Sequence, residues 1–282
     1  MRARTAGIAL ALLAVTSSCS PVGSEAGSGT STPARTGGSP SSPTASRAPR
    51  TPSGRASSST RAAPLAGVLI VIDPGHNGGN SSHLSRIQRQ VNAGGFRKPC
   101  NTTGTATNAG YPEHAFAFNV AKKLRKRLRR RGASVVLTRR SDHGVGPCVN
   151  KRGQVAANHE ADLLLSIHGD GAAPSAHGFT VLRPARVRGY TVHTFKRSGR
   201  LAHAVAHAMA RHGFDRATYL GRAGIDERGD LGTLNRAETP AVMVEVGNMR
   251  NPADARLMSR TRGRTRIARA LAAGIVRYVH QD

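Results

Sequence analysis

The sequence has 282 residues and carries 42 Lys and Arg against 15 Asp and Glu, a formal net charge of +27. Aromatic residues make up 4% of it, Trp is absent, and the sequence contains neither a helix-turn-helix spacing nor a set of zinc-finger ligands. These features argue against nucleic acid as a partner, which leaves anionic wall polymers, anionic lipid headgroups or a merely solvated arginine-rich surface to account for the charge.

Residues 1–19 predict an export signal. Two arginines precede an apolar run at 8–15, which is too short to span a membrane, and small residues follow at 16–18. Cys19 comes next, as in the lipobox of bacterial lipoproteins, although Thr16 takes the place where that motif usually has Leu. Two outcomes stay open: acylation of Cys19 with membrane attachment, or cleavage and release. Both place the protein in the cell envelope or outside the cell.

Residues 20–64 consist of Ser, Thr, Pro, Gly and Ala with scattered Arg, and they offer almost nothing to bury. This composition predicts a disordered tether that can span a wall or hold a domain away from a membrane. The remaining residues, 65–282, are enough for one catalytic domain, which we expect to be a monomer.

The folded part begins with a predicted strand at 68–72, followed by Asp73-Pro74-Gly75-His76. Residues 77–110 are rich in Gly, Asn and Thr and are predicted to form a loop, an insertion or flap beside the site. Pro112 then opens a predicted helix to about Arg131, with apolar residues at four-residue spacing and a basic opposite face.

Further along the chain, apolar strands alternate with amphipathic helices. Strands are predicted at 133–137, 161–168, 178–182 and 241–246, and helices at 151–159, 193–212 and 264–279. Continuous apolar strands between helices predict an α/β fold: a single domain with a mostly parallel central sheet covered by helices on both faces. In such folds ligands bind beyond the carboxyl ends of the strands.

Three polar residues stand where predicted strands end: His76, His168 and Glu245. Glu113 lies in the first turn of its helix. Two imidazoles and one carboxylate, with a fourth position left for water, are the ligands of a catalytic zinc ion. Glu113 is the better ligand because the positive end of the helix keeps it ionised. Glu245 is the better general base because partial burial raises the pKa of a carboxyl group.

Other polar residues near these positions have more than one interpretation. Asp73 either orients His76 through the second ring nitrogen or caps the turn. His114 adjoins Glu113 and is a candidate to support a ligand. Asn248 and Asn251 are candidates to line the cleft, although Asn251-Pro252 is read somewhat better as the start of a helix. Helix residues His203 and His207 have a metal-compatible spacing, but no Glu follows His203, which favours a polar helix face.

The cysteines agree with export. Once Cys19 is acylated or removed, Cys100 and Cys148 remain, and in an oxidising compartment we expect them to be bonded. A bridge that closes a loop of about fifty residues stabilises a fold by about 4 kcal/mol on the chain-entropy account. Neither cysteine has neighbours that suggest a catalytic thiol.

Four ordered motifs together carry a family resemblance. They are Asp73-Pro74-Gly75-His76; Glu113 with Asn119; Ser166-Ile167-His168-Gly169-Asp170; and the run from Pro240 to Asn248 with Asn251. From about residue 68 to 279 the chain resembles the zinc-dependent N-acetylmuramoyl-L-alanine amidases, the AmiC-like and mycobacterial cell-wall enzymes. The cysteine pair and the run 248–254 look closest to the mycobacterial branch.

The resemblance implies one Zn²⁺ bound by His76, Glu113 and His168, with Glu245 as the catalytic acid and base. It also implies the substrate, the amide between N-acetylmuramic acid and L-alanine in peptidoglycan or muropeptides. Val246 is one departure from the pattern. Another is Gly169-Asp170, where many members have Ala-Asn, which makes Asp170 a candidate for substrate positioning.

Two other functions are compatible with the same residues. A metallopeptidase could use the same ligands to cut a different peptidoglycan bond, because bond choice depends on the shape of the cleft. A wall-binding protein could keep the amidase fold without turnover. The presence of all four polar residues argues against a pure binder, which has no use for an unneutralised Glu245 beside a metal.

Overall fold

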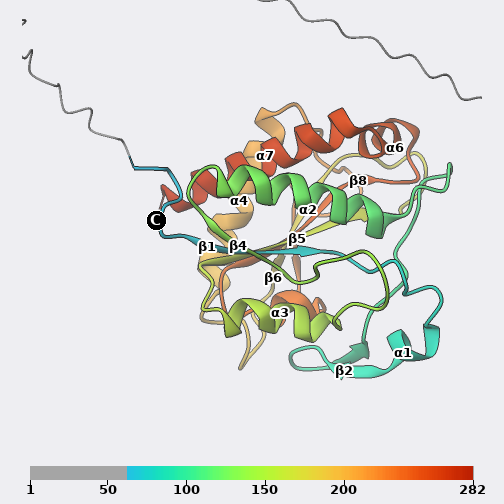
Figure 1. Cartoon of the computed structure of the whole chain (residues 1–282), viewed down its shortest axis with the longest axis horizontal. Coiled ribbons are helices and arrows are strands. Elements are labelled where there is room, and N and C mark those ends of the chain that lie inside the picture. The colour runs from blue at the N-terminus through green and yellow to red at the C-terminus, as the bar shows by residue number, and fades with distance from the viewer. Residues whose placement is uncertain (1–61, 282) are drawn as a thin grey trace, which may run out of the picture. The chain divides into compact units, whose positions relative to one another are not determined.

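The computed structural model of the protein describes residues 62–281 (Figure 1). The predicted export signal, Cys19 and nearly all of the predicted tether lie outside the described residues. Within residues 62–281 we find no helix with the length and apolar character that crossing a membrane requires.

A six-stranded sheet runs through the centre of the domain, in the strand order β4-β1-β5-β8-β6-β7. The first four strands of that order are mutually parallel, β6 is antiparallel to β8, and β7 is parallel to β6. The mostly parallel α/β sheet predicted from the apolar runs is therefore confirmed. The strand bounds are β1 Leu69–Pro74, β4 Ser134–Leu137, β5 Leu163–Asp170, β6 Thr180–Pro184, β7 Ile225–Arg228 and β8 Ala241–Asn248.

Helices cover both faces of this sheet, as Figure 1 shows. Ile70 and Ile72 pack into the larger core beneath α2, α4 and α7, whereas Val71 points to the smaller core on the α3 side. This alternation follows from the period of two along a strand, and it gives each buried strand two apolar faces. The helices are α2 Glu113–Arg129, α3 Val149–Asn158, α4 Phe195–Arg211, α5 Gly232–Asn235, α6 Pro252–Ser259 and α7 Thr261–Val279.

The segment predicted as a loop at 77–110, an insertion or flap beside the site, contains regular structure. It holds α1 (Leu84–Gln88) and a hairpin of β2 (Gln90–Asn92) and β3 (Arg97–Pro99). Each hairpin strand has three residues, too few to show an apolar alternation, and the turn between them relies on Gly94 and Gly95, both at φ +90°. The sequence predictions also missed β7 and α5.

Cys100 and Cys148 form a disulfide that joins the end of the hairpin to the start of α3. Cys148 is the N-cap residue of α3, and the backbone N–H of Val149 donates to the carbonyl of Cys100 at 2.8 Å. The bridge therefore holds the chain that follows β3 against α3. Two residues further on, Thr102 contacts the candidate site.

Candidate metal and catalytic site

His76 lies in the turn after β1 with a backbone φ of +55°, in the left-handed region that few residues other than glycine adopt. Its ring Nδ1 is 3.1 Å from the carbonyl oxygen of Thr102, and its Nε2 is 3.1 Å from Oε1 of Glu113. The carbonyl can only accept, so Nδ1 carries the proton in this contact. Nε2 is then left with the lone pair that a metal ligand needs.

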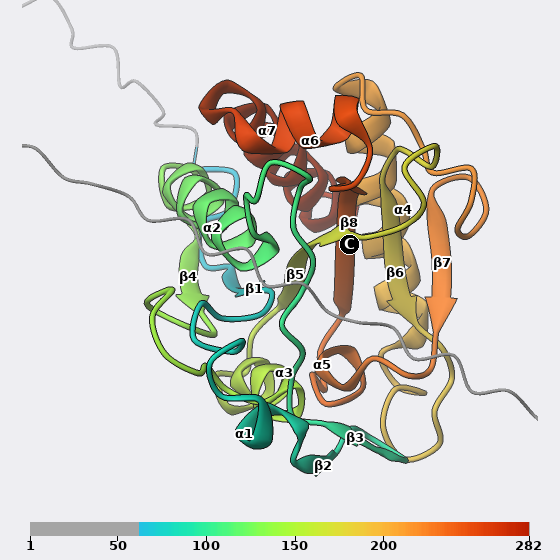
Figure 2. The same cartoon turned by 90° about the vertical axis from the view of Figure 1, so that its right-hand side faces the viewer.

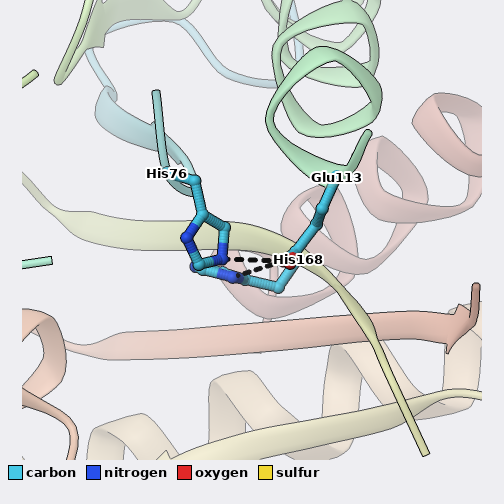
Figure 3. Close-up of side chains that lie close together, drawn as sticks. All are labelled: His76, Glu113 and His168. Atoms are coloured by element: carbon cyan, nitrogen blue, oxygen red, sulfur yellow. Dashed lines mark hydrogen bonds and ion pairs between the residues drawn. The ribbon is translucent and has the colours of Figure 1, made fainter. Parts of the chain in front are cut away.

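Glu113 is the first residue of α2 and holds the group together (Figure 3). Its Oε1 is also 2.9 Å from Nδ1 of His168, which lies near the carboxyl end of β5. The backbone N–H of Thr105 donates to Oε2 at 3.0 Å, and that of Gly169 donates to Oε1 at 3.2 Å. The carboxylate is thus fixed in position by backbone donors, and both imidazoles face its Oε1.

The donor atoms of His76, Glu113 and His168 lie within 4.8 Å of one another. Among residues 62–281 no other group of three or more His, Cys, Asp or Glu side chains could share an ion in this way. Burial raises the pKa of Glu113, but the two imidazoles outweigh it and hold the pKa below its usual value, so the carboxylate is ionised. Two imidazole nitrogens and an ionised carboxylate fit the preferences of a catalytic zinc ion.

Two glycines let the chain approach these side chains closely. A Cβ atom at Gly75 would lie 2.3 Å from Cε1 of His168, and one at Gly104 would lie 2.8 Å from Oε2 of Glu113. Any larger residue at either position would push a proposed ligand out of place.

Glu245 lies on β8 in register with His168 on the neighbouring strand β5, and both residues line one cavity of about 310 Å³. Its Oε2 is buried and has no hydrogen-bond partner in the described part of the chain. Burial raises the pKa of Glu245 well above its usual value, the nearby charges of Glu113 and Asp170 raise it further, and Arg228 opposes them. A carboxyl group whose pKa is raised in this way is suited to accept a proton and give it up again.

Asp73 has neither of its two predicted roles. Its carboxylate accepts from the hydroxyls of Thr138 at 2.5 Å and Ser166 at 2.7 Å and from the guanidinium of Arg152 at 2.9 Å. The strand alternation turns its side chain toward α3, away from the ring of His76. Burial raises the pKa of Asp73, but these partners, Arg152 first, bring it below the usual value.

Arg152 and Arg139 hold the backbone of the turn that carries His76. The buried guanidinium of Arg152 donates to the carbonyl oxygens of Pro74 at 2.7 Å and His76 at 2.8 Å. Arg139 donates to those of Pro74 at 2.9 Å and Gly75 at 3.1 Å. These contacts stabilise a strained turn. Sequence reasoning missed both residues, because one arginine among 42 Lys and Arg carries no visible signal.

The remaining candidates fall inside and outside the cavity. Asp170 lines it and accepts a hydrogen bond from the hydroxyl of Tyr219 at 2.8 Å. His114 instead lies 2.8 Å from the carboxylate of Asp142, and its ring is not part of the metal group. His203 and His207 lie on α4 and line a separate hollow. Tyr219 was not predicted, because nothing near it in the sequence resembles a site motif.

Asn248 and Asn251 stabilise loops and do not line the cavity. The side-chain amide of Asn248 donates to the carbonyl oxygens of Ala173 and Ala176 at 2.7 and 2.8 Å. Asn251 accepts from the backbone N–H groups of Ala253 and Asp254 and so caps α6. The interpretation of Asn251 as the start of a helix is confirmed.

The Arg152 contacts lead to a first prediction. Arg152→Lys keeps a positive charge beside Asp73 but loses the planar fork that reaches two carbonyl oxygens of the turn. Losing a group that orients a metal ligand typically costs about 10–100-fold in metal affinity, and we expect a loss in this range. Zinc affinity, measured by competition with a chelator, tests it, with the exposed α2 variant Arg129→Lys as the control. Unchanged affinity in Arg152→Lys together with a lowered melting temperature would show a role in stability alone.

Comparison with known proteins agrees with this geometry. Residues 70–277 match the family described as N-acetylmuramoyl-L-alanine amidase. The chain is 37% identical over 224 residues to the N-acetylmuramoyl-L-alanine amidase Rv3717 of Mycobacterium tuberculosis, a match that covers 79% of this chain and 91% of the relative. The fold is similar to that of the amidase Ami1 from Mycobacterium smegmatis, with a TM-score of 0.73, 36% identity and coverage of 77% and 99%. Apo Ami1 from Mycobacterium abscessus gives a TM-score of 0.70 at 38% identity, with coverage of 76% and 99%.

Proposed function

The chain belongs to the N-acetylmuramoyl-L-alanine amidase family, and we propose that it performs the family's reaction with a zinc ion held by His76, Glu113 and His168. The bond cleaved is the amide between N-acetylmuramic acid and L-alanine in peptidoglycan. The observation that carries the choice of metal is the convergence of two imidazoles and an ionised carboxylate at one wall of a cavity that also contains Glu245.

A bound zinc ion would polarise the scissile carbonyl group and acidify a water molecule, the two effects that make hydrolysis feasible at neutral pH. The chain's own residues supply the rest. The Thr102 carbonyl keeps the proton on Nδ1 of His76, and the backbone N–H groups of Thr105 and Gly169 hold the Glu113 carboxylate in place.

Glu245 is the proposed acid and base. Its carboxylate takes a proton from the attacking water and gives it to the nitrogen of the leaving L-alanine amine, which could not otherwise depart as a neutral group. The absence of a hydrogen bond to its Oε2 within the described residues supports this role, because that oxygen is free to receive the proton. Asp170, held by Tyr219, is proposed to position substrate at the same cavity.

The substrate places the site of action in the cell wall, outside the cytoplasm. We propose that the sequence at 1–19 exports the protein and that residues 20–64 tether the domain in the envelope, either through an acylated Cys19 or after cleavage. We propose a monomer. The arrangement of the described residues needs no second copy to complete the cavity.

Mass analysis of muropeptides incubated with the zinc-loaded full chain tests this function. We expect disaccharide that has lost its stem, alongside intact stem peptide, because the amide at the lactyl group is the bond cut. Trimmed stems would instead identify a peptidase. Binding without any product would identify a wall-binding protein. The Glu245→Gln variant, treated in the same way, controls for a contaminating hydrolase.

A further inference from the structure

A second hollow, larger than the catalytic cavity, lies at the β7 edge of the sheet on the side covered by α4. Its volume is about 1140 Å³, and it shares no lining residue with the catalytic cavity. In Figure 2, β7 forms the edge of the sheet, with α4 beside it. The walls come from β6, α4, the segment 216–227 and the end of α7. We call this hollow the α4–β7 groove.

The groove is strongly basic. Five arginines line it against two carboxylates, Asp226 and Glu227, so three positive charges are in excess. One arginine, Arg183 on β6, forms an ion pair with Glu227 at 2.6 Å, and its guanidinium stacks on the ring of Phe195. The arginines come from separate parts of the sequence, and the fold brings them to one concave surface: Arg183, Arg200, Arg216, Arg222 and Arg277.

This convergence differs from the basic faces elsewhere on the domain. On α2 the basic residues, such as Lys122 and Lys126, lie exposed to solvent along a single helix. In the groove, a chain lying along its floor would meet guanidinium groups from four different segments. His203 and His207, which were expected on a polar helix face despite their metal-compatible spacing, are exposed on the α4 wall of this groove.

We propose that the α4–β7 groove binds an anionic wall polymer whose repeating unit carries a phosphodiester, and so holds the amidase on its insoluble substrate. Guanidinium groups suit this ligand, because their planar donors pair with two oxygens of one phosphate. The groove fits a flexible polyanion better than a nucleic acid, since no Phe, Tyr or Trp lines it to stack a base.

A membrane surface is a poorer partner for the same groove. Binding to a bilayer through arginines is usually helped by apolar side chains that enter the interface. In the described part of the chain the large exposed apolar side chains are Leu84 and Val192, and neither lines the groove. A recessed surface also suits a single polymer chain better than a flat array of headgroups.

Binding of the full chain to poly(glycerol phosphate), measured at about 0.1 M salt, tests the proposal. The test variant carries Arg200→Gln, Arg216→Gln and Arg222→Gln. The matched control carries Lys122→Gln and Lys126→Gln on α2 and Arg130→Gln at its C-cap, so both lose the same charge. The loss of three exposed ion pairs predicts an affinity about tenfold weaker for the groove variant. We expect less than about twofold for the control, whose charges act only at long range.

Thermal unfolding and circular dichroism show whether both triple variants keep the fold, and single substitutions replace the triple if one does not. Equal losses in the two variants would overturn the proposal in favour of net charge alone, and no loss in the groove variant would overturn it directly. Two further probes test the chemistry. Polyglutamate binding as tight as that of poly(glycerol phosphate) would contradict phosphate recognition, and groove-dependent binding to phosphatidylglycerol vesicles without polymer binding would point to a membrane.

Discussion

Replacing His168 by alanine is expected to remove zinc from the protein and abolish turnover. The variant loses one of two imidazoles whose nitrogens converge on a single carboxylate oxygen, and Glu113 with His76 then offers only two ligands. A catalytic zinc ion normally has three protein ligands. Because losing a group that merely orients a ligand costs about 10–100-fold in metal affinity, losing the ligand itself should cost more.

Elemental analysis after dialysis against trace zinc measures the effect, and it does not depend on activity. We expect about one zinc per chain in the unaltered protein and much less in His168→Ala and His76→Ala. His193→Ala, which removes an exposed imidazole before α4, is the matched control and should keep its zinc. Full occupancy in either ligand variant would show that the metal lies elsewhere or that two of the three residues suffice.

The main parts of this site could be predicted because they sit at the ends of strong sequence signals. The run before His76, the run before His168 and the run before Glu245 are continuously apolar, and such runs become buried parallel strands. Parallel strands end at one edge of the sheet, so the polar residues at their ends gather there. The position of Glu113 could be predicted for a different reason, since it follows Pro112 at the start of a long amphipathic helix.

The supporting contacts could not be predicted in the same way, because they join segments far apart in the sequence. Arg152 meets Asp73 across 79 positions, and Thr102 meets His76 from a loop with no periodic pattern. The sequence around Asp73 offered only nearby roles, the turn and the imidazole, and both were wrong. The partners that the carboxylate has in the structure, Thr138, Ser166 and Arg152, lie on other segments, which only the folded topology brings near.

The position of Thr102 indicates that the disulfide also helps to position His76. Cys100 is tied to the start of α3, and the carbonyl of Thr102 two residues later accepts from the side-chain amide of Asn80 at 2.7 Å as well as contacting His76. The same helix carries Arg152, which holds the backbone of His76. Both restraints on His76, one on its ring and one on its backbone, therefore depend on α3.

Glu245→Gln is expected to keep zinc and lose activity, whereas Glu113→Gln is expected to lose zinc. The glutamine at 245 has nearly the shape of the glutamate but cannot accept the proton of the attacking water. Removal of a general acid or base typically lowers the rate by about 10²–10⁴-fold, and we expect the upper end because one carboxyl group serves both steps. At 113 a neutral amide replaces an anionic ligand that two imidazoles and two backbone N–H groups surround, so metal affinity itself should fall.

Each variant replaces one carboxylate oxygen by an amide nitrogen, so the two substitutions are controls for each other. Zinc content and muropeptide release are measured on both, and the release assay is repeated with excess zinc. Added zinc should restore part of the activity of Glu113→Gln by mass action, but none of that of Glu245→Gln, because occupancy does not limit the latter. An active Glu245→Gln protein would show that Glu245 is not the general acid and base. If Glu245→Gln lost its zinc while Glu113→Gln kept it, the proposed roles of the two residues would be reversed. The unpartnered Oε2 of Glu245 beside the cavity favours the proton-transfer role for this residue, and the fully bonded carboxylate of Glu113 favours the ligand role.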